Sequence, residues 1–393
     1  MQPAGAVSAP VLLLRDGGRC QRTTRAGNLP PAMDDPRQQN RTTQPLRRFR
    51  VFDNWDVVAD GWYIACASHE LRGTTPRAAT IAGQRIVVYR GADQQPRALD
   101  AFCPHMGTDL AIGKVVGDTL QCFFHHWRFD GEGACVAVPA LKEGESPPAK
   151  AKLQSYATCE RYGFVWVWPD RIAPAPVAEF PGLEGQDVVV WHDEPFERPC
   201  HHHVTMINGI DPQHLATVHD IHVDMSLDLA EHASGRVIDF VLRGDLDSKL
   251  ARALIGPRYA YGMRYADACL GLLTTAMDLR LFGSGPRIPE VRTGYAYTPL
   301  ANNKTRVQPF YVAPRGRGPI AWIKARALLL SAWIGYRALR NEDGKIYDNM
   351  RFQPQSLLPL DRPVGRFIAY VNRLRPSLWS NKVDESLADL EGS

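Results

Sequence analysis

The chain has 393 residues, of which 45% are hydrophobic and 22% charged, and these values predict a globular protein of two domains with additional segments. Its net charge of +4 is uneven: residues 1–50 hold nine Arg and three Asp, a net +6, so the remainder carries −2. Residues 51–393 are therefore not basic, and we expect no nucleic-acid partner.

The N-terminal segment, residues 1–45, is rich in Arg, Gln, Pro, Gly and Thr and lacks apolar periodicity, which predicts a disordered basic tail. A start at Met33 would leave residues 1–32 outside the native protein, and a basic targeting arm is the functional alternative. The apolar run Val11–Leu14 is too short for the core of a signal peptide. Eight cysteines are few for this length, so we predict a cytoplasmic protein whose cysteines are metal ligands or core residues.

Residues 46–170 consist of short β-like runs separated by Gly, Pro and Asp turn residues, and they predict a small all-β domain. The runs include Trp62–Ala65, Arg85–Tyr89, Leu99–Phe102, Thr119–Phe123 and Phe164–Trp168. Residues 171–187 contain three prolines and two glycines, which predicts a linker.

Residues 188–393 begin with a helical pattern near 207–220, continue with strand-like runs and end with a helical pattern from Ile320 to about Met350. The strand-like runs are Gly235–Leu242, Leu272–Leu281, Arg292–Tyr297 and Thr305–Val312. This order predicts an α+β domain with an antiparallel sheet rather than alternating βαβ units.

The most apolar stretch, Ala321–Ala338, is interrupted by Lys324, Arg326 and Arg337, so we predict no transmembrane span. A buried helix or one that covers the domain is the main expectation. A helix that docks on a membrane surface or a partner is the alternative.

Two cysteines and two histidines form the first candidate metal site, Cys103-Pro-His105 and Cys122-Phe-Phe-His125, with sixteen residues between the pairs. A zinc site is one alternative, but zinc sites usually pair like ligands, whereas here each pair supplies one thiolate and one imidazole. A two-iron cluster would take two thiolates on one iron and two imidazoles on the other. Such a cluster has a potential of about −150 to +300 mV, against about −400 mV for plant-type ferredoxins.

The motif Cys103-Pro-His105…Cys122-x-x-His125 resembles the Rieske [2Fe–2S] motif, and the resemblance spans about residues 50–170. It implies that these four residues bind the cluster. His126 departs from the family, which usually has Gly at this position before the Trp. We assign His125 as the ligand because it keeps the family spacing.

A second pair of histidines, His214 and His219, follows Asn208 and Asp211 in a predicted helix. Residues five apart on a helix point in different directions, so these imidazoles converge only if the helix is irregular or ends between them. Alone, the pair fits either a metal site or a structural role. Downstream of a Rieske-like motif, Asn208-x-x-Asp211-x-x-His214-x4-His219 resembles the mononuclear iron motif of the Rieske non-haem iron oxygenases.

This resemblance implies a facial triad of two imidazoles and one carboxylate on Fe(II), with positions left for O2 and substrate. The family places the carboxylate on a late helix, where this chain has Glu342, Asp343 and Asp348. We predict Asp343 as the third ligand, with Asp348 as the alternative. Glu342 would be solvated or would support a ligand.

Asp211 and Asn208 have further roles by resemblance. Asp211 would bridge His125 of one subunit to His214 of the next, which implies a head-to-tail ring, expected to be a homotrimer. Asn208 would hold a water or the triad. The implied fold class is α+β: an N-terminal all-β Rieske domain, then a catalytic domain whose antiparallel sheet is covered by helices in a helix-grip-like arrangement.

Two expectations concern residues outside these motifs. The run Cys200-His201-His202-His203 suggests a metal site, but we expect its side chains to alternate between the faces of a strand or to lie at the surface, leading into the active-site helix. We expect the substrate pocket among sheet residues 235–312, for example Phe240, Leu272, Met277 and Phe310.

The resemblance predicts an oxygenase component that takes electrons from a separate ferredoxin, an NAD(P)H reductase or both, because the chain has no nicotinamide or flavin motif. With O2 it would hydroxylate, demethylate, desaturate or oxidatively cyclise a hydrophobic small molecule such as an aromatic, sterol-like or secondary-metabolite compound. The alternatives are a Rieske electron-transfer protein without catalytic iron and a zinc-stabilised interaction protein. Metal content separates them: three irons per chain, two irons, or zinc.

Overall fold

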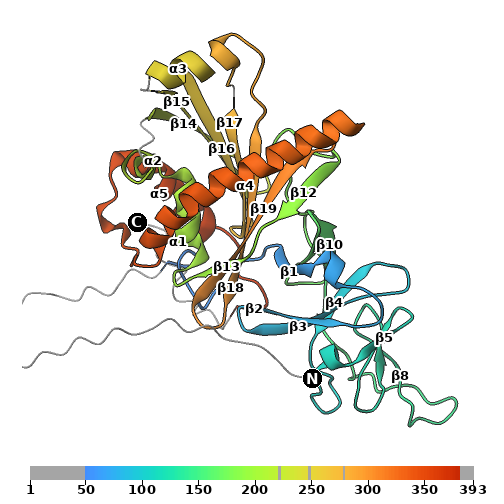
Figure 1. The fold of residues 1–393 in the computed structure, drawn as a ribbon. Coiled ribbons are helices and arrows are strands. Elements are labelled where there is room, and N and C mark those ends of the chain that lie inside the picture. Colours follow the sequence, from blue (N-terminus) through green and yellow to red (C-terminus); the bar gives the residue numbers. More distant parts are fainter. Residues whose placement is uncertain (1–48, 220–222, 247–248, 278, 381–393) are drawn as a thin grey trace, which may run out of the picture. The chain divides into compact units, whose positions relative to one another are not determined.

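Antiparallel strands make up most of the protein. The computed structural model describes residues 49–219, 223–246, 249–277 and 279–380. The predicted tail, residues 1–45, lies outside them. Along the described chain, three small sheets are followed by one large sheet (Figure 1).

The first region contains three small sheets, in the orders β1-β11-β10, β2-β3-β4-β9 and β5-β6-β7-β8. Its strands are β1 (Tyr63–Ala67), β2 (Arg77–Ile81), β3 (Gln84–Arg90), β4 (Pro96–Asp100), β5 (Lys114–Val116), β6 (Thr119–Gln121), β7 (Arg128–Phe129), β8 (Cys135–Ala137), β9 (Ser155–Tyr156), β10 (Thr158–Arg161) and β11 (Phe164–Val167). Each strand-like run predicted here overlaps one of them, so the predicted all-β region is confirmed. Val87, Leu99, Leu120 and Phe129 form one of its cores, which also includes Cys103 and Cys122 of the loops that follow β4 and β6.

The second region is an eight-stranded antiparallel sheet in the order β12-β19-β18-β17-β16-β15-β14, with β13 also pairing to β19. Its strands are β12 (Val188–His192), β13 (Phe196–Arg198), β14 (Val223–Glu231), β15 (Val237–Leu246), β16 (Arg258–Ala266), β17 (Leu270–Met277), β18 (Val291–Leu300) and β19 (Lys304–Pro314). The α+β class with an antiparallel catalytic sheet is therefore confirmed.

Helices cover this sheet and connect its strands. They are α1 (His202–Met206), α2 (Pro212–Thr217), α3 (Lys249–Ile255), α4 (Pro319–Tyr347) and α5 (Arg362–Asn372), with shorter 3-10 turns η2 (Ser68–Glu70), η3 (Leu110–Ile112), η4 (Ile207–Ile210), η5 (Leu281–Gly283), η6 (Pro354–Ser356) and η7 (Pro359–Asp361). The long helix α4 lies along β18 and β19 (Figure 1).

Helix α4 covers the sheet with small and branched side chains. Ala325, Leu329 and Ala332 are buried against Tyr311 and Ala313 of β19, which confirms the predicted domain-covering role. Within the described residues, no helix is long and apolar enough to cross a membrane.

The segment predicted as a linker, residues 171–187, is packed rather than loose. Its Val177, Phe180 and Leu183 are buried in one core with Trp166 of β11 and Phe310 of β19. This segment therefore contributes apolar surface to both regions. The domain boundaries at residues 46, 171 and 188, which separate the tail, the Rieske domain, the linker and the catalytic domain, stay predictions.

A buried charged cluster also joins the two regions. Arg236 forms an ion pair with Asp267 (2.6 Å), donates to the backbone oxygen of Asp60 (2.8 Å) and lies over the ring of Trp168. Burial raises the pKa of Asp267 to about 6 despite this guanidinium. The joint therefore contains a carboxyl group that resists ionisation.

Candidate metal centres

The first centre is built on the loops after β4 and β6, which carry Cys103 and Cys122. Both thiols are buried and in contact with each other. Burial raises the pKa of Cys103 to about 11, and the charge of Cys122 acts in the same direction. Because sulfur binds metals as thiolate, the pair requires the positive charge that iron would supply.

The two histidines of this centre lie on its solvent side. The ring centroids of His105 and His125 are 4.7 Å apart, and His105 stacks on Trp127 at 4.3 Å with the ring planes 7° apart. Two adjacent thiols inside and two adjacent imidazoles outside fit a cluster in which one iron takes both sulfurs and the other takes both nitrogens.

His126 has a backbone φ of +57°, in the left-handed region that favours glycine. This conformation explains why glycine suits the position after the ligand histidine. The His126 side chain is exposed. The departure of the motif from the family pattern thus places a non-glycine residue in a left-handed backbone conformation.

The second centre begins on the segment α1–η4–α2. Helix α2 ends at Thr217, between His214 and His219, and this break allows the two side chains to converge. Their ring centroids lie 5.3 Å apart with the planes at 80°. An uninterrupted helix would have separated them.

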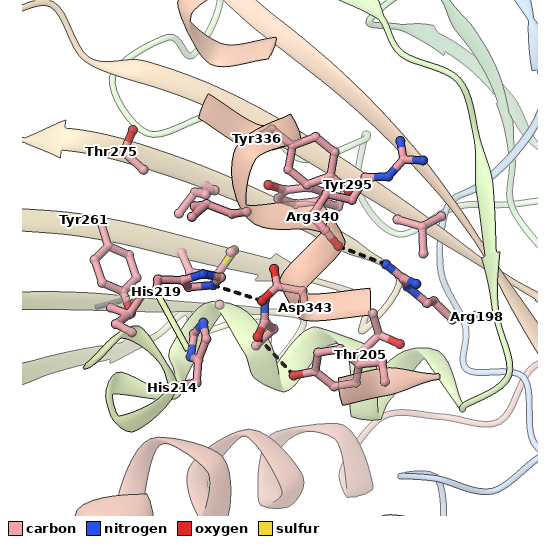
Figure 2. A pocket seen from close by; sticks show the side chains of 18 of the residues that line it. Arg198, Thr205, His214, His219, Tyr261, Thr275, Tyr295, Tyr336, Arg340 and Asp343 are labelled. Carbon is pink, nitrogen blue, oxygen red and sulfur yellow. Dashed lines mark hydrogen bonds and ion pairs between the residues drawn. The ribbon is translucent and has the colours of Figure 1, made fainter. Parts of the chain in front are cut away.

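The third member comes from the far end of the chain. Asp343 of α4 places Oδ1 3.0 Å from Nε2 of His219. One candidate ligand atom from each of His214, His219 and Asp343 lies within 4.8 Å of the others (Figure 2). Two imidazoles and one carboxylate are the donor set of a facial-triad iron site, so the residues fit a mononuclear Fe(II).

Both histidines are oriented through Nδ1. Nδ1 of His214 lies 2.5 Å from the backbone oxygen of Asp211, and Nδ1 of His219 lies 2.8 Å from Oε2 of Glu342. In each ring Nε2 remains for a metal. Burial lowers the pKa of His214, which favours the neutral imidazole that metals bind.

The other predicted residues lie around this triad. Asp348 forms an ion pair with Arg198 at 3.0 Å and is not grouped with the histidines. Asn208 accepts a hydrogen bond from the hydroxyl of Tyr347 (3.2 Å). The Asp211 carboxylate caps α2 by accepting from the N–H of Gln213 (2.9 Å), a role that the sequence did not indicate.

A cavity of about 160 Å³ adjoins the triad. Its walls are rich in tyrosine, namely Tyr259, Tyr261, Tyr295, Tyr297, Tyr336 and Tyr347. Burial raises the pKa of every one of these phenols, so they remain neutral hydrogen-bond donors. Met263 and Leu273 add apolar surface.

The expected lining residues Phe240, Leu272, Met277 and Phe310 do not line this cavity. Successive side chains of a strand face opposite sides, and Leu273 faces the cavity while Leu272 lies in the core. Leu272 and Phe310 lie in the core on the opposite face of the sheet, whereas Phe240 is on the cavity face, paired with Met263, but on β15, which does not line the cavity. The missed signal was the set of tyrosines spaced two apart, Tyr259/Tyr261 and Tyr295/Tyr297.

The prediction for Cys200–His203 was also wrong. The three histidines neither alternate along a strand nor lie at the surface: His201 is the N-cap of α1, and all three are fully buried. Their rings pack against one another with centroids 4.0 to 4.4 Å apart.

Comparison with known proteins gives the family of the chain. A model of the Rieske [2Fe-2S] domain matches residues 61–157. Cholesterol 7-desaturase nvd 1 of Ciona intestinalis is 33% identical over 343 residues, which cover 82% of this chain and 70% of that protein. Aminopyrrolnitrin oxygenase PrnD of Pseudomonas fluorescens is 37% identical over 142 residues, or 35% of this chain and 38% of that protein.

Cholesterol 7-desaturase nvd of Hemicentrotus pulcherrimus is 34% identical over 211 residues, or 52% of this chain and 44% of that protein. The chain thus spans less than half the length of some curated relatives that it matches. A crystal structure of dicamba monooxygenase bound to dicamba shares the fold, with a TM-score of 0.58 at 20% identity over 80% of this chain and 97% of that one.

The chain belongs to the Rieske non-haem iron oxygenases. The cofactors of this family are a Rieske [2Fe–2S] cluster and a mononuclear iron. The donor sets of the two centres described above fit these two groups.

Proposed function

We propose that this chain is the oxygenase component of a Rieske system and oxidises a hydrophobic small molecule with O2. The observation that carries the proposal is the convergence of His214, His219 and Asp343 at the wall of a tyrosine-rich cavity. An electron carrier without catalytic iron would need neither the triad nor the cavity. Fe(II) held there would supply the activation of O2.

The residues around the triad hold its ligands and position the substrate. Glu342 and the backbone oxygen of Asp211 fix the orientation of the two imidazoles. The cavity walls offer aromatic faces for a planar or fused-ring molecule and phenol hydroxyls for a polar group on it. In the part of the chain that the structure describes, the hydroxyl of Tyr261 is buried without a hydrogen-bond partner. We therefore favour a ring-containing substrate that carries an oxygen or nitrogen atom.

The surface around the cluster supports a head-to-tail assembly. Met106, Phe123 and Phe124 are exposed beside His105 and His125. Exposed apolar side chains at one place mark contact surfaces. We propose that a second copy covers them and that Asp211 of that copy accepts a hydrogen bond from His125. A closed ring of three copies would make every cluster a neighbour of an iron centre.

The electron donor in this proposal is a separate ferredoxin, a reductase or both, which is the usual arrangement of the family. A cytoplasmic location stays a prediction, and it rests on the cysteine content. Among the relatives, one is named for the chloroplast, Protein TIC 55 of Pisum sativum.

The test is substrate-dependent oxidation of the chemically reduced cluster under O2. Sterol-like compounds, aromatic compounds and nitrogen-containing ring compounds are added singly to protein that contains three irons per chain. A compound that accelerates cluster oxidation and yields an oxidised product supports the proposal. Protein with two irons, or with a cluster that no compound affects, would indicate an electron carrier.

A matched variant tests the role of Asp211. Asp211→Asn retains the helix cap, because asparagine is an equally good N-cap residue, but it removes the charge. We expect unchanged metal content and cluster oxidation slower by about 10- to 100-fold, the usual effect of losing a partner of a ligand histidine. An unaffected rate would remove Asp211 from the contact between subunits.

A further inference from the structure

We propose that His201, His202 and His203 form a third metal site, for an imidazole-binding transition-metal ion of the zinc class. One nitrogen from each ring lies within 4.8 Å of the others. The side chains are 2%, 0% and 0% exposed. Neither the cluster nor the iron triad uses these residues, and the proposed oxygenase activity does not require them.

The first argument is that the cluster holds unsatisfied polar atoms. Within the described residues, both ring nitrogens of His202 are buried without a hydrogen-bond partner. His201 accepts at Nδ1 from the N–H of His203 at 3.2 Å and also contacts the backbone of Asn54, and the ring of His203 contacts the backbone of Val51. Each buried polar atom left without a partner costs about 1–3 kcal/mol, so native proteins contain few of them. A bound ion would engage one nitrogen of each ring.

The second argument is the donor chemistry. Burial lowers the pKa of all three histidines, and that of His201 falls to about 3, so the rings stay neutral. Neutral imidazoles suit zinc, copper, nickel and iron, whereas calcium and magnesium require oxygen ligands. Three nitrogens leave a fourth tetrahedral position for a water molecule.

The surroundings resemble the support that metal-binding histidines need. Phe52 stacks on His203 with the centroids 5.7 Å apart, and Trp55 meets the ring of His201 at 4.6 Å. The rings of His201 and His203 also have backbone partners, Asn54 and Val51 respectively, the kind of support that fixes the orientation of a ligand histidine.

An ion can reach this cluster from the surface. His201 lines a pocket of about 330 Å³ together with Trp55, Pro299 and Asn303. The cluster also lies at the start of α1, which leads through η4 and α2 to His214. A metal here would link the histidines that residues 51–55 contact to the segment α1–η4–α2. Its role would be to stabilise the segment that carries the iron ligands His214 and His219.

The experiment is metal analysis of the holoenzyme after loading with zinc(II) and removal of unbound ion. We expect one zinc per chain in addition to three irons. His202→Gln should lose the zinc while it keeps its irons and the cluster absorption. The matched control is His69→Gln, an exposed histidine on η2, which should bind zinc like the wild type.

Zinc in the iron triad must be distinguished from zinc in this site. His219→Ala disables the triad, so zinc that survives in this variant is bound elsewhere, as proposed. If zinc is lost with His219→Ala, or if the wild type binds none, the proposal is wrong and the three rings are a core element. Should His202→Gln fail to fold, X-ray absorption at the zinc edge of the wild type decides: three imidazole nitrogens at about 2.0–2.1 Å support the site, and carboxylate oxygens contradict it.

Discussion

The two centres of this chain are assembled in opposite ways. The cluster ligands all lie between residues 103 and 125 on neighbouring loops of one small region, with the histidines exposed. The iron triad joins two side chains near residue 214 to one on α4, and its ligands lie at the wall of a cavity. A local change should therefore affect the cluster alone, whereas the triad depends on how α4 packs on the sheet.

The location of each centre matches its proposed task. A cluster that passes electrons to a neighbouring subunit requires an edge at the surface of its own chain, and His105 and His125 provide one. An iron that acts on an organic substrate requires a cavity beside it, and the tyrosine-rich cavity provides one. In the proposed function, electron transfer and oxidation thus take place at separate sites.

The largest effect expected is from the single carboxylate that completes the triad. Asp343→Ala should lower turnover by at least about 10³-fold, because two imidazoles alone bind Fe(II) poorly. Iron should fall from three to two per chain while the cluster spectrum stays unchanged. Turnover and iron content measured on the same preparation check this prediction.

The matched control is Asp348→Asn on the same helix. Asp348 pairs with Arg198 rather than with the histidines, so we expect its variant to retain iron and most activity. If Asp348→Asn is inactive and Asp343→Ala is not, the ligand assignment is reversed.

The difference between the centres also explains how much the sequence could predict. The cluster motif keeps its ligands at fixed spacing, so Cys103, His105, Cys122 and His125 could be assigned without a structure. The α+β class and the positions of β15, β17, β18, β19 and α4 followed from their apolar runs. Asp343 required the resemblance to a family, because spacing does not relate it to His214.

Other features depended on packing that no local pattern records. The break in α2 at Thr217 brings His219 to His214, and it is stabilised by contacts that include Glu342, more than 120 residues away. His201–His203 are buried because residues 51–55 pack against the start of α1, with Phe52 and Trp55 in contact with the histidine rings. A run of three polar residues suggests a surface, and only the tertiary contacts reverse that expectation.

A medium effect is expected at Glu342, which accepts from Nδ1 of His219. Glu342→Ala should weaken iron binding by about 10- to 100-fold, the usual cost of removing such a partner. Glu342→Gln keeps an acceptor oxygen and should lose less. Iron titration of chelated protein measures both, and the cluster serves as the internal reference. Equal affinity in the alanine variant would show that Glu342 does not orient His219.

A smaller effect is expected at the joint between the regions, where burial raises the pKa of Asp267 to about 6. The folded state then binds this proton more tightly than the unfolded chain, so Asp267 contributes less stability as pH rises from 5 to 7. Relative to Asp267→Asn, which does not titrate, the wild type should lose about 1 kcal/mol of unfolding free energy over this range. Denaturant unfolding of both proteins at the two pH values measures the difference. A constant difference would place the carboxyl pKa near its ordinary value.

The smallest effect concerns the cluster loop itself. His126 holds a left-handed backbone conformation that costs a non-glycine residue about 1–2 kcal/mol, and glycine would remove this cost but lose more entropy on folding. We expect His126→Gly to raise the unfolding free energy by less than about 1 kcal/mol and His126→Ala, which keeps a Cβ, to raise it not at all. Neither variant should change the cluster spectrum, because the exposed imidazole of His126 is not assigned as a ligand. A spectral change in both variants would mean that His126, and not His125, binds the cluster, and that the sequence spacing misassigned even the local centre.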